Sequence, residues 1–173
     1  MSYPWFQPPV KPKIFLSYHH NGDRWYYDAF SRLFCDSYDV ARDNSVDRII
    51  DSDNADYVIR NIREDYITGT SCTIVLCGAE TPGRKFVDWE IKATLDREHG
   101  LIGINLPSNR AYADGTWPVP DRFLDNYRSG YAVWTAWNHL VAAPASLAGL
   151  INQARSSEKW KIDNSRVLRT RNS

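Results

Sequence analysis

A glutamate and a pair of histidines are the side chains best suited to chemistry in this 173-residue sequence. Glu90 stands in the first turn of a predicted helix, where a carboxylate can stabilise positive charge that develops on a ligand. A glutamate at this position also has a purely structural explanation, because the helix macrodipole stabilises acidic residues near helix N-termini by about 0.3–1 kcal/mol. His19 and His20 are acid–base candidates, since neutral histidine titrates near physiological pH. Consecutive residues diverge in direction, so we expect at most one of the two to face a site.

Alternating strand and helix patterns position these residues. Short apolar runs predict strands, and apolar residues at helical spacing predict the helices between them. The predicted strands are residues 14–18, 39–42, 71–77, 101–106 and 131–137. The predicted helices are one that follows Asp23, which is expected to cap it, and residues 57–67, 86–95 and 144–156. Residues 108–128 are expected to form a loop with one short helical turn.

This order predicts an α/β fold with three layers, in which helices flank a central, mostly parallel five-stranded sheet. Residues 71–77 form a nearly continuous apolar run, which places that strand at the sheet centre. Ligands of such sheets bind beyond the carboxyl ends of the strands. We therefore expect three loops, residues 18–24, 43–56 and 78–88, to converge on a site there.

Composition excludes several classes of function. Lys plus Arg and Asp plus Glu both number 21, so no net charge favours nucleic acid or an anionic membrane surface. No apolar stretch approaches the roughly 18 residues of a membrane span, and the N-terminus does not resemble a signal peptide. Three cysteines without a CxxC pair predict neither disulfides nor a metal site, and a cytoplasmic location fits reduced thiols. Cys72 and Cys77 should point to opposite faces of one strand.

We expect three regions along the chain. The prolines among residues 1–12 predict an extended arm, and residues 13–156 should form the α/β domain. Residues 157–173 are polar and are expected to be a flexible tail. Glycine patterns that cradle phosphates, GxGxxG or a P-loop, are absent from the sequence.

Most of the chain, from residue 13 to about 155, resembles TIR domains. Ile14-Phe-Leu-Ser-Tyr18 is similar to their opening strand, and residues 71–78 are similar to their central strand. Phe86-Val-Asp-Trp-Glu-Ile91 resembles the segment that holds the TIR glutamate. With the tandem His19-His20, the sequence looks closest to the bacterial TIR-like family that includes the signal-generating subunit of Thoeris anti-phage defence. The resemblance implies the flavodoxin-like fold of TIR domains.

That resemblance implies an enzyme that cleaves the nicotinamide–ribose bond of NAD+, releasing nicotinamide and ADP-ribose or a cyclised isomer. Glu90 inherits the catalytic role, and NAD+ is a substrate, so no cofactor or metal is expected. The chemistry is compatible, because a carboxylate can stabilise or trap an oxocarbenium-like centre. Nicotinamide leaves as a neutral pyridine, so a second carboxylic acid is unnecessary.

Five further residues are implied as substrate contacts. Ser17 and Tyr18 end the first strand, and His19 stands where many TIR domains carry a basic residue. Asp43 could bind ribose hydroxyls, although most acidic residues in such a polar run are simply solvated. Trp89 could stack on the pyridinium ring, but it lies about 100° around the helix from Glu90, which makes a core position its main alternative.

Two other functions remain open. The first is a TIR-like interaction module that assembles with other proteins and turns nothing over. The second is an enzyme that resembles nucleoside deoxyribosyltransferases and uses the same glutamate chemistry on free nucleosides. The leading interpretation implies a downstream effector protein that senses the nucleotide product, with self-association as a further expectation.

Overall fold

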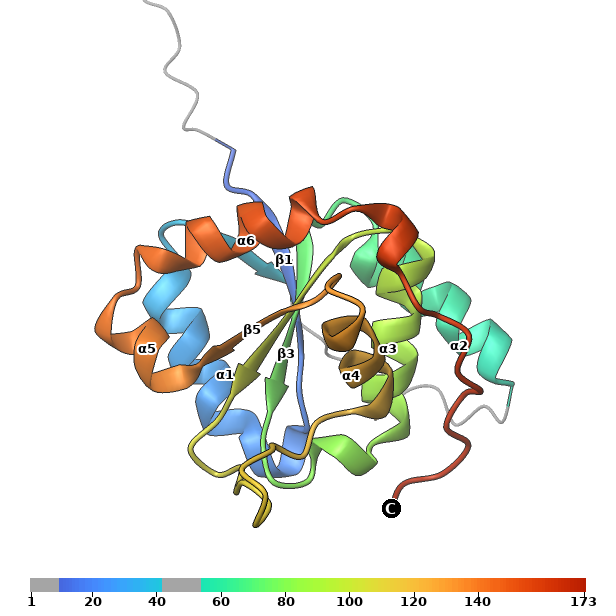
Figure 1. Ribbon diagram of the computed structural model, residues 1–173. Helices are drawn as coiled ribbons and strands as arrows, with labels where there is room; N and C mark the ends of the chain where they lie inside the picture. The colour runs from blue at the N-terminus through green and yellow to red at the C-terminus, as the bar shows by residue number, and fades with distance from the viewer. Residues whose placement is uncertain (1–9, 42–53) are drawn as a thin grey trace, which may run out of the picture.

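The computed structural model describes residues 10–41 and 54–173, and a single parallel sheet lies at its centre (Figure 1). The sheet has five strands in the order β2-β1-β3-β4-β5, and every neighbouring pair is parallel. The strands are β1 Lys13–Ser17, β2 Asp39–Ala41, β3 Cys72–Cys77, β4 Gly100–Asn105 and β5 Val133–Ala136. The predicted α/β fold and the central position of β3 are therefore confirmed.

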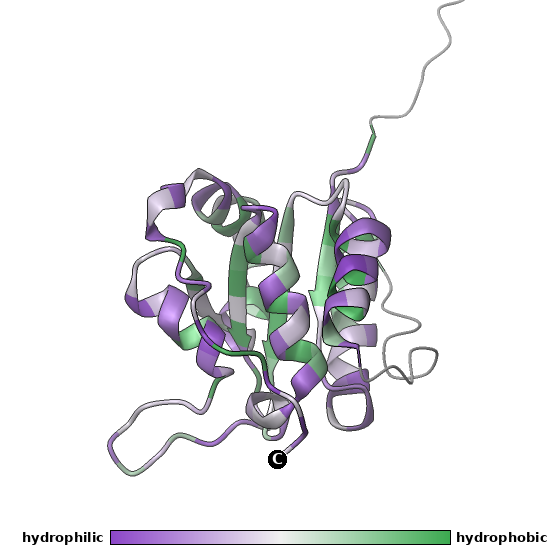
Figure 2. Ribbon diagram, turned by 90° about the vertical axis from the view of Figure 1, so that its right-hand side faces the viewer, coloured by the Kyte–Doolittle hydropathy of each residue, from purple (hydrophilic) through white to green (hydrophobic). Residues whose placement is uncertain are grey.

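Helices cover both faces of the sheet and form the outer two layers (Figure 1). One face packs against α1 His20–Phe34, α5 Trp137–Ala142 and α6 Ser146–Ser156. The other packs against α2 Ala55–Asn61, the π-helix Ile62–Ile67, α3 Lys85–Asp96 and α4 Asp121–Arg128. Two short 3-10 helices, Thr81–Gly83 and Lys159–Lys161, complete the described elements. Figure 2 shows the apolar strands enclosed between these helices.

Side chains alternate across the sheet and so divide the core in two. On β1, Ile14 and Leu16 join the cluster under α1 and α6, whereas Phe15 joins the cluster under α2 and α3. On β3, Cys72 and Cys77 likewise lie in different clusters, as the two-residue period of a strand predicts. Both thiols are fully buried, and burial raises the pKa of the Cys72 thiol to about 12.

Local structure departs from the sequence expectation in several elements. The predicted helix over 57–67 begins as α2 but continues as a π-helix, and it ends where Gly69 takes a φ of 83°. The predicted short turn before residue 128 is the full helix α4, and α5 follows β5 without having been predicted. Within the described residues, no helix is both long and apolar enough to cross a membrane.

The end of the chain differs most from expectation. Residues 157–173 were expected to be a flexible tail, but they pack along α3 and α4 (Figure 1). The first and last residues of the segment 163–173 both make backbone hydrogen bonds to the rest of the domain. At the first residue, Asn126 Nδ2 donates to Asp163 O at 2.7 Å. The Ser173 amide donates to Gly83 O at 3.1 Å. The segment packs in this way because its polar side chains and carbonyls satisfy buried polar groups of the two helices.

Gly103 on β4 provides a test of the packing between the sheet and α4. A Cβ atom there would lie 2.4 Å from Cζ of Phe123 and 2.7 Å from Cε3 of Trp134. We expect Gly103→Ala to lower the free energy of unfolding by about 1–3 kcal/mol, because overpacking forces buried rings to move. Urea unfolding followed by circular dichroism measures this change.

Gly149 provides the matched control, because nothing lies within 4 Å of a Cβ atom added at this position in α6. Gly149→Ala should raise the free energy of unfolding by roughly 0.5–1 kcal/mol, since alanine loses less conformational entropy in a helix. Equal stability changes in the two variants would contradict the packing described here.

Candidate functional site

Glu90 lies against the carboxyl end of β1. Its carboxylate accepts a hydrogen bond from Ser17 Oγ, and both side chains are buried. Since α3 begins at Lys85, Glu90 is the sixth residue of the helix rather than a first-turn residue as predicted. The macrodipole effect falls off within the first turn. The ordinary explanation for an acidic residue at this position therefore does not apply.

Packing on three sides of α3 fixes the direction in which Glu90 points. Val87, Ile91 and Leu95 contact the α4 side, whereas Trp89 and Ala93 contact the α2 side. Glu90 and Thr94, one helical turn apart, face the sheet between these two clusters.

Thr94 anchors that face to the central strand. Its Oγ1 lies 2.7 Å from Thr73 Oγ1 of β3 and 2.8 Å from the Glu90 carbonyl oxygen. β1 therefore contacts the Glu90 side chain through Ser17. β3 contacts Thr94, whose hydroxyl bonds to the Glu90 carbonyl oxygen.

Tyr18 follows Ser17 but faces the other side of the sheet. Its ring stacks on Tyr27 of α1 with centroids 4.6 Å apart, and its hydroxyl lies 3.1 Å from Nδ1 of His20. Ser17, on the α3 side of the sheet, donates to the carboxylate of Glu90. The substrate role of Tyr18 stays a prediction, and it would require a ligand that spans the end of β1.

His19 joins the loop after β1 to the loop after β3. Its Nε2 lies 3.0 Å from Oε2 of Glu80, and Arg84 donates to the same carboxylate. His19 is buried, whereas the Glu80 side chain is 60% exposed. The structure thus brings together two of the three loops expected to converge.

Asp23 is a buried carboxylate at this edge that the sequence interpretation did not include among the site residues. It does not cap α1, because His19 occupies the N-cap position and its carbonyl accepts from the Asp23 amide at 2.9 Å. The Asp23 carboxylate instead accepts from Thr81 Oγ1 at 3.1 Å. A Cβ atom at Gly78 would lie 2.2 Å from Asp23 Oδ1, so glycine is required for this approach. A glycine directly after a buried strand is the sequence signal that could have indicated the contact.

Burial raises the pKa of Asp23 above its ordinary value of 3.8. The Thr81 hydrogen bond and the electrostatic interaction with His19 oppose this rise in the Asp23 pKa, and the charge of Glu80 adds to it. The carboxyl group is therefore easier to protonate in the folded protein than in the unfolded chain.

The remaining predicted residues are not gathered at Glu90. Trp89 lies in the core cluster with Phe15, and its Nε1 donates to Arg169 O at 2.8 Å. This is the core position that sequence analysis gave as the alternative to a ligand contact. Asp43 lies outside the described residues. Among the residues that are described, no three His, Cys, Asp or Glu side chains cluster as a metal ion would require.

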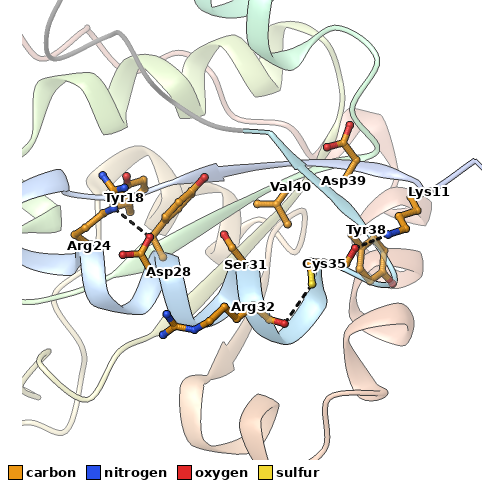
Figure 3. Close-up of a pocket in the computed structure, with 11 residues that line it drawn as sticks. Lys11, Tyr18, Arg24, Asp28, Ser31, Arg32, Cys35, Tyr38, Asp39 and Val40 are labelled. Carbon is orange, nitrogen blue, oxygen red and sulfur yellow. Dashed lines mark hydrogen bonds and ion pairs between the residues drawn. The ribbon is translucent and has the colours of Figure 1, made fainter.

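A cavity of about 620 Å³ runs beside α1 (Figure 3). Tyr18 and Arg24 line one end, and Lys11 and Tyr38 line the other. Its size suits a small ligand. Glu90 does not line this cavity, because β1 places it on the α3 side of the sheet.

Replacing Asp23 by asparagine tests its burial. Above the folded-state pKa, the native protein must hold a buried charge, so stability is lost as pH rises through that pKa. Below about pH 3.8 both states are protonated and this loss disappears. The free energy of unfolding of Asp23→Asn, minus that of the parent, should increase as pH rises from about 3 through the folded-state pKa of Asp23 and level off above it.

Urea titrations at each pH give this difference. Asp36→Asn, at an exposed position after the same helix, is the control and should show no comparable increase. A difference for Asp23→Asn that falls with pH would mean that its carboxylate is stabilised in the charged form.

Comparison with known families identifies one family that matches the chain. A family model described as Thoeris protein ThsB, TIR-like domain, matches residues 15–111, more than half of the chain. The matched region includes Ser17 and Glu90 together with β3 and β4. No curated protein matches the chain. The protein belongs to the TIR-like domain family of Thoeris anti-phage defence.

Proposed function

We propose that this protein cleaves the nicotinamide–ribose bond of NAD+ and so produces an ADP-ribose-type signal in anti-phage defence. The observation that carries the proposal is the carboxylate of Glu90, held by Ser17 at the carboxyl end of β1. Parallel α/β sheets bind their ligands at this edge. The family match supports a role in anti-phage defence. The buried Glu90 carboxylate supports cleavage of the nicotinamide–ribose bond.

Glu90 is the residue that acts on the reacting sugar carbon. As the glycosidic bond breaks, positive charge develops on the ribose, and an adjacent carboxylate stabilises it or bonds to it. The bonding electrons leave with nicotinamide, which departs as a neutral pyridine. The Ser17 hydroxyl donates to the carboxylate and fixes its orientation. No metal or organic cofactor is needed for this step.

The fate of the ribosyl centre determines the product. Attack by water gives ADP-ribose, whereas attack by a nucleophilic atom of the same molecule gives a cyclic isomer. We propose that a separate effector protein senses this nucleotide, and that the enzyme acts in the cytoplasm.

Burial of Glu90 sets a condition on turnover. The residue is 1% exposed, so substrate can reach it only after the side chains that cover it move. Enzymes commonly use such a closing and opening step to exclude water. The same burial favours a second function, an interaction module without turnover, in which Glu90 and Ser17 only join α3 to β1.

Nicotinamide release from NAD+ by the purified full chain tests the proposal. The assay is repeated over a range of protein concentrations and with extract of phage-infected cells, because assembly or a trigger could open the site. Glu90→Gln keeps the size of the side chain but removes its charge. We expect it to lower the rate at least about 100-fold, the usual effect of removing one electrostatic contact to a transition state.

Glu64→Gln is the matched control, because Glu64 is exposed on the π-helix and should leave the rate unchanged. Equal turnover by the Glu90→Gln variant and the parent would remove the proposed mechanism. Absence of turnover under every condition would favour the interaction module. Cleavage of free nucleosides in place of NAD+ would favour an enzyme that resembles nucleoside deoxyribosyltransferases.

A further inference from the structure

Residues 163–173, here called the C-terminal strap, hold the helix that carries Glu90. The strap makes three hydrogen bonds to the first half of α3 and one to the 3-10 helix just before it. The Arg169 amide donates to Asp88 Oδ2 at 2.9 Å, and Trp89 Nε1 donates to Arg169 O at 2.8 Å. The Lys85 amide donates to Asn172 Oδ1 at 3.0 Å, and the Ser173 amide donates to Gly83 O at 3.1 Å. Glu90 follows directly after two of the bonded residues.

Arg122 joins the strap, α3 and α4 at one point. Its side chain is fully buried, and its Nε lies 2.8 Å from Asp88 Oδ1. Its other nitrogens donate to Asn164 Oδ1 at 2.9 Å and to Arg166 O at 2.9 Å. A buried guanidinium needs all of these acceptors, since an unpaired buried charge is strongly destabilising. Arg122 therefore fixes the strap to the same carboxylate that the Arg169 amide contacts.

Asp88 and Glu90 lie on opposite sides of α3, because two residues turn a helix by about 200°. The strap and Arg122 hold the outer side through Asp88, while Ser17 holds the inner side through Glu90. Leu168 of the strap also packs against the cluster that contains Trp89. With both sides held, α3 can neither rotate nor move away from the sheet without breaking buried hydrogen bonds.

We infer that the C-terminal strap is a positioning element for Glu90, an inference that rests on the proposed function. The strap touches no reacting atom. It sets the depth and rotation of the first turns of α3, and thereby the distance between the Glu90 carboxylate and the sugar carbon that it must stabilise. A misplacement of about 1 Å can lower a rate about 100-fold.

A chain that ends at Val167 tests this inference. It loses Leu168, the three hydrogen bonds to α3 and the one to Gly83. It keeps the Arg122 bonds to Asn164, Arg166 and Val167. The fold should therefore survive. We expect kcat to fall roughly 10- to 100-fold with KM changed less than about twofold, because position rather than affinity is lost. Amide hydrogen exchange over residues 86–91 should become faster.

Two further variants accompany the truncation. Trp89→Phe removes the indole donor to Arg169 and should shift exchange and kcat in the same direction by a smaller factor. Arg171→Ala is the control, because Arg171 makes no hydrogen bond or ion pair with any other described residue, and neither quantity should change. A purely structural strap would lower the melting temperature while kcat per folded molecule stayed constant, and that result would overturn the inference.

Hydrogen exchange separates this inference from the proposed function. If the full chain releases no nicotinamide, the proposed function fails, and unchanged exchange over residues 86–91 in the truncated chain would overturn the strap inference independently. Faster exchange with unchanged kcat, or a change confined to KM, would also overturn it.

Discussion

A largely buried helix must have each of its buried polar side chains paired from another element, and α3 imposes this constraint here. Eight of its twelve residues are buried, among them Asp88, Glu90 and Thr94. Each of the three is paired by a different part of the chain: Asp88 by Arg122 of α4, Glu90 by Ser17 of β1 and Thr94 by Thr73 of β3. Unpaired, any of these groups would be strongly destabilising.

This pairing explains why distant segments are ordered together. Arg122 places a buried charge in the first turn of α4. Asp88 supplies some of its hydrogen-bond acceptors, and the strap supplies the others. Asn126, one turn later, bonds both backbone groups of Asp163 in the same way. Apolar contacts alone would leave α3 free to slide along the sheet. The hydrogen bonds specify one position, which is what a site built on a helix needs.

The sheet could be predicted from the sequence, whereas α4 and the strap could not. Apolar runs such as residues 71–77 identify buried strands directly, because strand period and burial are properties of the local sequence. Arg122 and Asn126 look like loop residues in a sequence. Partners about 40 residues later, together with Asp88 for Arg122, make them core residues. Strand alternation alone could have shown that Ser17 and Tyr18 face opposite sides. Glu90 was identified through family resemblance, since nothing in its own segment distinguishes it from a solvated acidic residue.

The strap also determines the order in which the protein can be completed during synthesis. A chain leaves the ribosome from its N-terminus, and early segments begin to fold before late ones exist. When α3 emerges, Asp88 still lacks Arg122, and Arg122 in turn lacks the carbonyls of residues 166 and 167 until they follow. The helix that holds Glu90 therefore lacks these partners until residues 163–173 have emerged. Until then a nascent chain carries the glutamate without the surroundings that place it.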